Sequence, residues 1–67
     1  MITIKVNQKD HKILESLTLE EFVEDLNIQT NGIAIAVNSS VVKKNDWSLK
    51  LLQHNDDILI IKSTQGG

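Results

Sequence analysis

The feature that most limits the fold of this chain is one short amphipathic stretch near its N-terminal third. Thr18 is followed three residues later by Glu21, the spacing of a capping box in which each side chain accepts from the other residue's backbone N–H. Apolar side chains then recur at helical spacing and form a single stripe: Leu19, Phe22, Val23 and Leu26. The pattern predicts one helix over residues 19–26, whose stripe must be buried against a second layer.

The remaining segments supply strands for that layer. Ile2, Ile4 and Val6 alternate with polar residues, which is typical of a strand with one buried face. Further strands are predicted over residues 11–15, 33–37, 41–42 and 57–62. Polar turns separate these segments at residues 7–10, 31–32, 38–40 and 54–56. Asp46 either caps a single helical turn around Trp47 or only forms a turn.

The order strand, strand, helix, strand, short strand, strand is that of a sheet wrapped around one helix, an α+β arrangement. If the first and last strands pair in parallel at the centre, the architecture is a β-grasp, the ubiquitin-like fold. We infer that pairing from the apolar run at residues 58–61, which is typical of a strand covered over much of both faces. Periodicity by itself leaves other α+β arrangements open. We expect a β-grasp domain of about five strands over residues 1–62 and a flexible tail over residues 63–67.

Composition excludes several functions. The chain has 67 residues and no cysteine, so one domain must be held by packing, without disulfides or thiolate metal sites. Two isolated histidines are too few for a metal centre. A net charge of −2 and only two aromatic residues, Phe22 and Trp47, argue against nucleic-acid binding. No apolar run reaches membrane-span length and no export signal is recognised, so we expect a cytoplasmic protein that is monomeric when free.

The chain ends in Gly66-Gly67, preceded by a short polar spacer. Glycine has no Cβ, so this backbone can lie in a channel too narrow for any side chain. The five residues 63–67, when extended, reach roughly 17 Å. We therefore predict that the Gly67 carboxylate reacts inside another protein's active site while the body docks outside. The same ending is also typical of a frayed terminus.

Docking would need a surface beside the tail. If Ile58 and Ile60 face the helix, alternation turns Leu59 and Ile61 outward, beside Ala34 and Ala36. This predicts a flat apolar patch for a partner, unless a loop or the curl of the sheet covers it. Three other residues are expected to have no binding role: Trp47 as a core or rim filler, and His11 and His54 as solvated turn residues.

Taken together, several segments resemble the ThiS family of sulfur carriers in thiamin thiazole biosynthesis. They are residues 31–38, Val41-Val42, Trp47, residues 57–61 and Gln65-Gly66-Gly67. The resemblance covers nearly the whole chain, and its most specific parts are the Asn-Gly strand segment and the Gly-Gly end. Family members often carry glycine in two turns that here read Asn38-Ser39-Ser40 and His54-Asn55-Asp56. Asparagine tolerates positive φ, so both turns remain possible.

The resemblance implies a protein cosubstrate and not an enzyme. A ThiF-like adenylating enzyme would use ATP and magnesium to join the Gly67 carboxylate to AMP. A sulfur donor protein would then convert the adenylate to a thiocarboxylate, which a ThiG-like thiazole synthase would use. Thr64, Gln65 and Gly66 would contact these partners, and the chain itself would bind no cofactor or metal.

Two kinds of alternative remain open from the sequence. One is another carrier or tag of the same fold: the small subunit of molybdopterin synthase or a protein-modifying ubiquitin-like protein. Both also use a Gly-Gly tail, so the tail cannot separate them from the thiamin branch. The other is a β-grasp interaction module whose terminal glycines are inert. Chain length and the segment from Asn31 to Val42 favour the thiamin branch.

Overall fold

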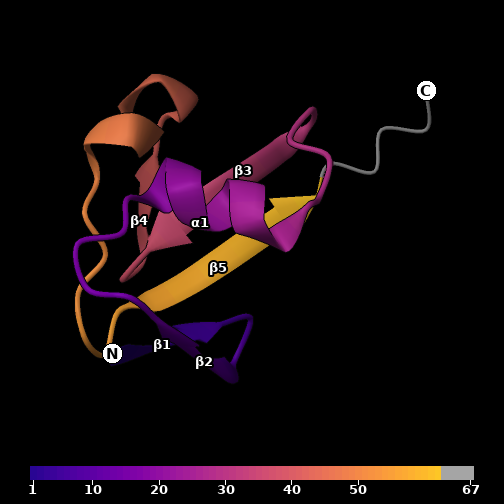
Figure 1. Ribbon diagram of the computed structural model, residues 1–67. Helices are drawn as coiled ribbons and strands as arrows, with labels where there is room; N and C mark the ends of the chain where they lie inside the picture. The colour runs from indigo at the N-terminus through magenta and orange to yellow at the C-terminus, as the bar shows by residue number, and fades with distance from the viewer. Residues whose placement is uncertain (63–67) are drawn as a thin grey trace.

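Five strands, one α-helix and one 3₁₀-helix make up residues 1–62, the part of the chain that the computed structural model describes (Figure 1). Their bounds are β1 Ile2–Val6, β2 Lys9–Ile13, α1 Leu19–Leu26, β3 Ile33–Val37, β4 Ser40–Val42, η1 Lys44–Leu49 and β5 Asp57–Lys62. The sheet order is β2-β1-β5-β3-β4, and only β1 and β5 pair in parallel. The predicted α+β class, with a mixed five-stranded sheet and a parallel central pair, is confirmed.

Helix α1 has the predicted bounds and the predicted cap. The Glu21 backbone N–H donates to Thr18 Oγ1 at 3.1 Å, and the Thr18 N–H donates to Glu21 Oε1 at 3.0 Å. The helix ends at Asn27, whose φ of 55° lies in the left-handed region that asparagine tolerates. Leu19, Phe22 and Val23 of its stripe are buried and Leu26 is half-buried. In Figure 1 the helix lies across β5 and β3.

The second strand begins and ends two residues before its predicted bounds, at Lys9–Ile13. Asn7 and Gln8 both have positive φ, as in a type I′ turn, so the hairpin needs only two loop residues. Lys9 therefore lies opposite Val6, and the pairing reaches its end where Ile13 lies opposite Ile2. The expected continuation through residues 14–15 was wrong because β1 offers no further partner there.

One of the two histidines also differs from its prediction. His11 lies within β2 and not in a turn, half-buried, with its ring edge-on to Phe22 at a centroid distance of 6.1 Å. His54 is an exposed turn residue, as predicted, and its Nδ1 accepts from the Thr3 N–H at 3.1 Å. His11 therefore helps to cover the helix, whereas His54 supports the loop before β5.

The turn at residues 38–40 and the turn at residues 54–56 are linked by side chains. Asn38, at φ 53°, donates from Nδ2 to Asp56 Oδ1 at 3.0 Å and accepts from the Asp57 N–H at 3.0 Å. The other Asp56 oxygen accepts from the Gln53 N–H at 2.8 Å. Asp56 is the buried polar residue of the described chain, at 7% exposure. These bonds brace both turns against each other at the start of β5.

The segment after β4 forms a longer helical element than expected. The 3₁₀-helix η1 has Lys43 at its N-cap, without a side-chain cap bond, and Asp46 lies inside its first turn. A capping role for Asp46 was therefore wrong. Trp47 is a core residue at 3% exposure, and its Nε1 donates to the Val42 carbonyl oxygen at 3.0 Å. This bond satisfies the indole N–H inside an apolar environment.

The core lies between α1 and the inner face of the sheet. Its fully buried side chains come from the helix and from three central strands: Ile4, Leu19, Val23, Ile35 and Ile58. Ile58 belongs to β5, which has β1 on one side and β3 on the other. The strand that leads to the predicted tail therefore lies inside the sheet, with a neighbouring strand on each side.

Candidate functional site

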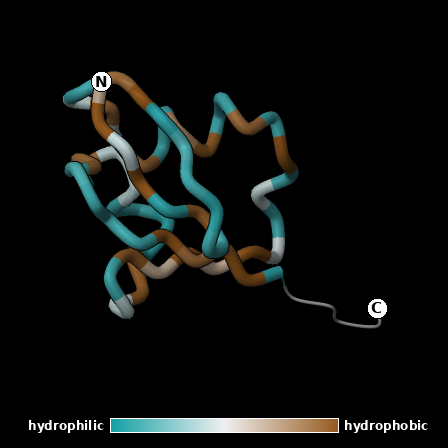
Figure 2. Tube along the Cα trace, turned by 90° about the horizontal axis from the view of Figure 1, so that it is seen from below, coloured by the Kyte–Doolittle hydropathy of each residue, from teal (hydrophilic) through white to brown (hydrophobic). Residues whose placement is uncertain are grey.

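The outer face of the sheet, opposite α1, carries a row of apolar side chains near the C-terminal end of β5. Ala36 lies opposite Leu59 on one side and opposite Val41 on the other, and Ala34 lies opposite Ile61. Residues that lie opposite each other in a sheet share a face. We call these five residues the outer patch. In Figure 2 the brown, hydrophobic run of β5 continues until just before the grey trace, where a short teal segment ends the described strand.

The outer patch is open to solvent in the described chain. Leu59 and Ile61 are each 47% exposed, and Val41 is 69% exposed, while Ile58 on the inner face is fully buried. The alternation predicted for β5 is confirmed. The interpretation of this strand as covered on both faces was wrong, because α1 packs on the inner face and no element within residues 1–62 covers Leu59 or Ile61.

Ala34 and Ala36 differ from each other. Ala34 is exposed, but Ala36 retains only 7% exposure because its single methyl group lies between the larger Leu59 and Val41 side chains. Ala36 therefore forms the floor of the outer patch and not part of its raised surface. Small floor residues keep such a surface flat, which suits contact with another protein.

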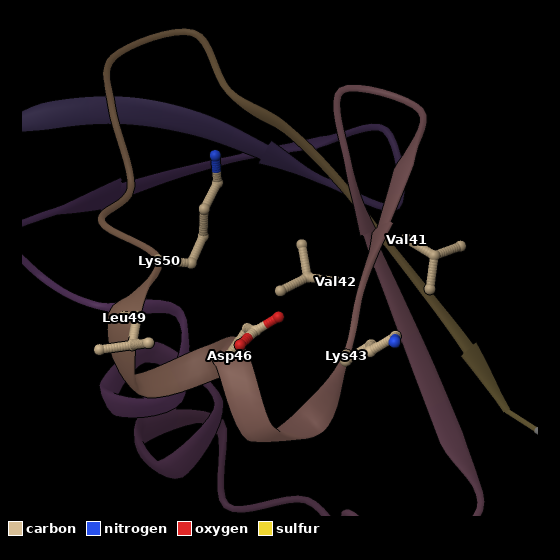
Figure 3. Close-up of a pocket in the computed structure, with 6 residues that line it drawn as sticks. All are labelled: Val41, Val42, Lys43, Asp46, Leu49 and Lys50. Atoms are coloured by element: carbon tan, nitrogen blue, oxygen red, sulfur yellow. The ribbon is translucent and has the colours of Figure 1, made fainter.

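Val41 was missing from the predicted patch. Figure 3 shows that Val41 and Val42 point to opposite sides of β4, with Val42 directed toward η1. The two-residue turn at Asn38 and Ser39 places Val41 opposite Ala36, which extends the patch to the edge of the sheet. The sequence held part of this signal, since asparagine is favoured at the first position of a two-residue hairpin turn, but the glycine that often follows it is replaced here by Ser39.

Charged residues border the outer patch. Lys5 lies opposite Asp57 across the parallel pair, and Asp10 lies opposite Lys5 across the first hairpin. A shallow hollow of about 170 Å³ marks the boundary, and its lining combines patch and border residues: Gln8, Ala36, Ser39, Asp57 and Leu59. An apolar centre with a polar rim is the usual anatomy of a protein–protein contact surface.

In the sequence, the predicted tail follows the outer patch directly. Ile61 precedes Ser63 by two residues, so the patch ends where the predicted tail begins. Gly67, with the predicted partner contacts Thr64, Gln65 and Gly66, lies outside the described residues, and their roles stay predictions. A second hollow, of about 200 Å³, lies beside the end of β5, and its lining includes Asn31, Gly32 and Lys62.

A further hollow within residues 1–62 offers no catalytic arrangement. It lies between β4 and η1, measures about 420 Å³, and is lined by Val41, Val42, Lys43, Asp46, Leu49 and Lys50 (Figure 3). This lining pairs apolar side chains with lysines and one carboxylate, without a serine, threonine or histidine beside a base.

Across the described residues, no three His, Asp or Glu side chains gather closely enough to hold a metal ion. Within residues 1–62, neither helical element has the length and apolar character that a membrane span requires.

Comparison with known proteins assigns this arrangement to a family. The ThiS family model matches residues 3–67, which is nearly the entire chain and includes both terminal glycines. The chain belongs to the ThiS family. The sulfur carrier protein ThiS of Escherichia coli (strain K12) is 32% identical over 50 residues, which cover 75% of this chain and 76% of that relative.

A solved structure agrees with the fold. The crystal structure of the thiamine biosynthesis protein ThiS from Geobacter metallireducens superposes with a TM-score of 0.87. It covers 98% of this chain and 100% of its own, at 20% sequence identity. At that identity the likeness supports the β-grasp architecture of the ThiS family, and the sequence matches carry the family assignment.

Proposed function

We propose that this ThiS family member is a sulfur carrier for thiamin thiazole biosynthesis, and that sulfur is carried on the C-terminal carbonyl of Gly67. The observation that carries the proposal is the family match, which runs through Gly66-Gly67. The Escherichia coli relative is named a sulfur carrier protein, which supports the same chemistry here. The match to this family favours the thiamin branch over the molybdopterin and protein-tagging alternatives.

Loading begins with activation of a poor electrophile. A carboxylate is negatively charged and would have to expel oxide, so it resists attack by a sulfur nucleophile. A ThiF-like adenylating enzyme would join the Gly67 carboxylate to AMP and release pyrophosphate from ATP. Magnesium in that enzyme's site would offset the phosphate charge. The carrier itself supplies the reacting carboxylate and no catalytic group.

Sulfur then replaces the phosphate leaving group. The terminal sulfur of a donor persulfide attacks the Gly67 carbonyl carbon, AMP departs, and an acyl disulfide forms. A second thiol cleaves the sulfur–sulfur bond, which releases the Gly67 thiocarboxylate and leaves a disulfide behind. Because this chain contains no cysteine, the persulfide and the second thiol both belong to partner proteins.

The outer patch would dock the carrier during these steps. Leu59 and Ile61 present half-exposed apolar side chains directly before the tail, so a partner that covers them is held close to the reacting end. The loaded thiocarboxylate is a nucleophile that stays attached to the protein. A ThiG-like thiazole synthase would bind the same outer patch and use that sulfur to build the thiazole ring.

Intact mass measurement tests the proposal. The carrier is incubated with the candidate adenylating enzyme, ATP, magnesium and a persulfide donor, and the expected product has one oxygen replaced by sulfur. A variant with one residue added after Gly67 should show no exchange, because the reactive carboxylate is displaced while residues 1–62 are unchanged. A carrier that keeps its original mass under conditions that load the Escherichia coli relative would overturn the proposal.

A genetic test addresses the pathway. A variant without Gly66 and Gly67 should fail to rescue a thiamin auxotroph that the full chain rescues. A Gly66→Ala variant is a milder change, and its Cβ should slow loading by obstructing a channel shaped for glycine. Rescue by the shortened variant would show that the terminal glycines are dispensable, and it would favour a simple interaction module.

A further inference from the structure

Strand β5 is longer than its parallel partner. The pairing with β1 covers only Lys5 opposite Asp57 and Val6 opposite Ile58, because β1 then turns back into β2. Four more residues of β5 follow Ile58. On the other side, β3 pairs with β5 as far as Lys62. The last part of the strand would therefore be held from one side unless another group replaced β1.

The side chain of Asn7 makes that replacement. The Asn7 backbone N–H donates to the Ile58 carbonyl oxygen at 2.9 Å, which completes the backbone pairing. Its Oδ1 then accepts from the Ile60 N–H at 2.8 Å, while its Nδ2 lies 3.5 Å from the Ile60 carbonyl oxygen. The side-chain amide thus binds β5 as the next residue of a longer β1 would have done.

The location of this contact is significant for the outer patch. Ile60 lies between Leu59 and Ile61, the two large side chains of the patch, so the backbone bond fixes the pleat that turns both outward. Within residues 1–62, the structure contains no hydrogen bond from β1 or its turn to any β5 residue beyond Ile60. Asn7 is therefore the last contact on that edge before the strand leads toward Gly67.

We propose that Asn7 is a positioning residue for the loading reaction. By holding Ile60 it sets the direction in which β5 leaves the sheet, and so fixes the point beside the outer patch from which the predicted tail starts. The inference rests on the proposed sulfur-carrier function. Its physical basis is preorganisation, since a strand end held in one direction loses less entropy when its extension is threaded into an active site.

A purely local role for Asn7 is the competing explanation. Asn7 has φ 49°, and asparagine suits this turn whatever its side chain binds. Asn7→Gly separates the two roles, because glycine keeps the turn conformation and removes the amide. Asn55→Gly is the matched control: Asn55 has φ 72° in the loop before β5, and its side chain has no hydrogen-bond partner among residues 1–62.

The experiment combines amide exchange with loading kinetics. In Asn7→Gly, loss of one hydrogen bond should accelerate hydrogen exchange at the Ile60 amide by up to about tenfold. The kcat for adenylation by the partner should fall by roughly three- to tenfold, with KM nearly unchanged because Leu59 and Ile61 remain in place. Asn55→Gly should leave both quantities near the wild-type values. Asn7→Asp keeps an acceptor for the Ile60 N–H but replaces the Nδ2 donor near the Ile60 carbonyl with an oxygen, so it should restore part of the loss.

Each outcome separates the two proposals. If wild-type carrier is not adenylated at all, the sulfur-carrier function fails and this inference fails with it. If the wild type is loaded and Asn7→Gly is loaded equally well, only the positioning role is overturned. Unchanged Ile60 exchange in Asn7→Gly, equal loss in Asn55→Gly, or an Asn7→Asp variant as slow as Asn7→Gly would each contradict it as well.

Discussion

Asparagine takes the positive φ angles in this chain that glycine often takes in turns. Among residues 1–62, positive φ angles occur at seven non-glycine residues, and four of them are asparagines: Asn7, Asn27, Asn38 and Asn55. Asparagine tolerates the left-handed region because its short polar side chain bonds locally. Asn7 and Asn38 illustrate the benefit, since each uses its amide to bind the backbone of β5. Gln8, Ser16 and Ser39 take the same conformation without that advantage.

Ser39→Gly should therefore stabilise the protein. Ser39 has φ 72° in the two-residue turn between β3 and β4, where a Cβ is unfavourable. Relief of that strain, reduced by the greater freedom of glycine in the unfolded chain, should leave a gain of roughly 0.5–1 kcal/mol. Thermal unfolding followed by circular dichroism should show a higher Tm. Ser40→Gly, one residue later within β4, should lower it, and a lower Tm for both variants would contradict the strain argument.

Asp56→Ala should be among the more destabilising single changes at a polar site. It removes the acceptors for the Asn38 side chain and the Gln53 N–H, and it leaves both donors without partners in a part-buried location. The expected loss is about 2–3 kcal/mol in the free energy of unfolding. Urea denaturation measures it. The neighbouring Asp57→Ala, on an exposed side chain, should change stability by about 0.5 kcal/mol or less; similar losses in the two variants would refute the bracing role of Asp56.

At the scale of elements, helix α1 and strand β5 differ in how they are held. The helix is short, and its N-terminal cap and its buried stripe both come from its own local sequence. Strand β5 depends on distant partners: β1, β3 and the Asn7 side chain. Changes to the helix should therefore alter global stability, whereas changes around β5 should also alter the geometry of the outer patch.

Thr18→Ala tests the cap of α1. The substitution removes the Oγ1 acceptor for the Glu21 N–H, and we expect a loss of about 1 kcal/mol in the free energy of unfolding. Glu21→Ala should cost less when Thr18 is already alanine, because the two side chains act as one capping box. Chemical denaturation of the two single variants and the double variant measures this coupling. Glu20→Ala, in the same helical turn, serves as the control; strictly additive losses for Thr18 and Glu21 would mean that the box adds nothing.

For the whole molecule, the two faces of the sheet have separate tasks. The inner face and α1 bury the side chains that stabilise the fold, including the fully buried Ile58. The outer face leaves Leu59 and Ile61 of β5 and Val41 of β4 exposed. Folding gains little from these three side chains while they remain in water. A partner that covers them recovers that hydrophobic free energy.

Leu59→Asp should weaken binding to the proposed adenylating enzyme without unfolding the protein. A charge in the middle of the outer patch would have to be desolvated in the complex, so we expect a Kd increase of roughly 30-fold, or about 2 kcal/mol. Leu14→Asp is the matched control, because Leu14 is 65% exposed and directly follows β2, the edge strand on the side of the sheet away from the patch. Titration calorimetry compares the two variants. An unchanged Kd for Leu59→Asp would remove the patch from the docking surface.

Strand bounds and register show where prediction from sequence stopped. The strand over 57–62 and the helix over 19–26 were predicted at their observed bounds, because apolar runs and capping residues are local signals. The second strand was misplaced by two residues because a two-residue turn at Asn7 and Gln8 was not recognised. That turn decides the register of the first hairpin, and the similar turn at Asn38 adds Val41 to the outer patch.

The sequence by itself determined which residues form the helix, which side chains it buries and that several strands must cover it, because each of these follows from periodicity within a few residues. Tertiary structure alone decided that Leu59 and Ile61 stay uncovered and that Asn7 holds Ile60. The second contact joins residues 53 positions apart. Such a contact depends on where β1 ends relative to β5, and that relation exists only when the sheet is assembled.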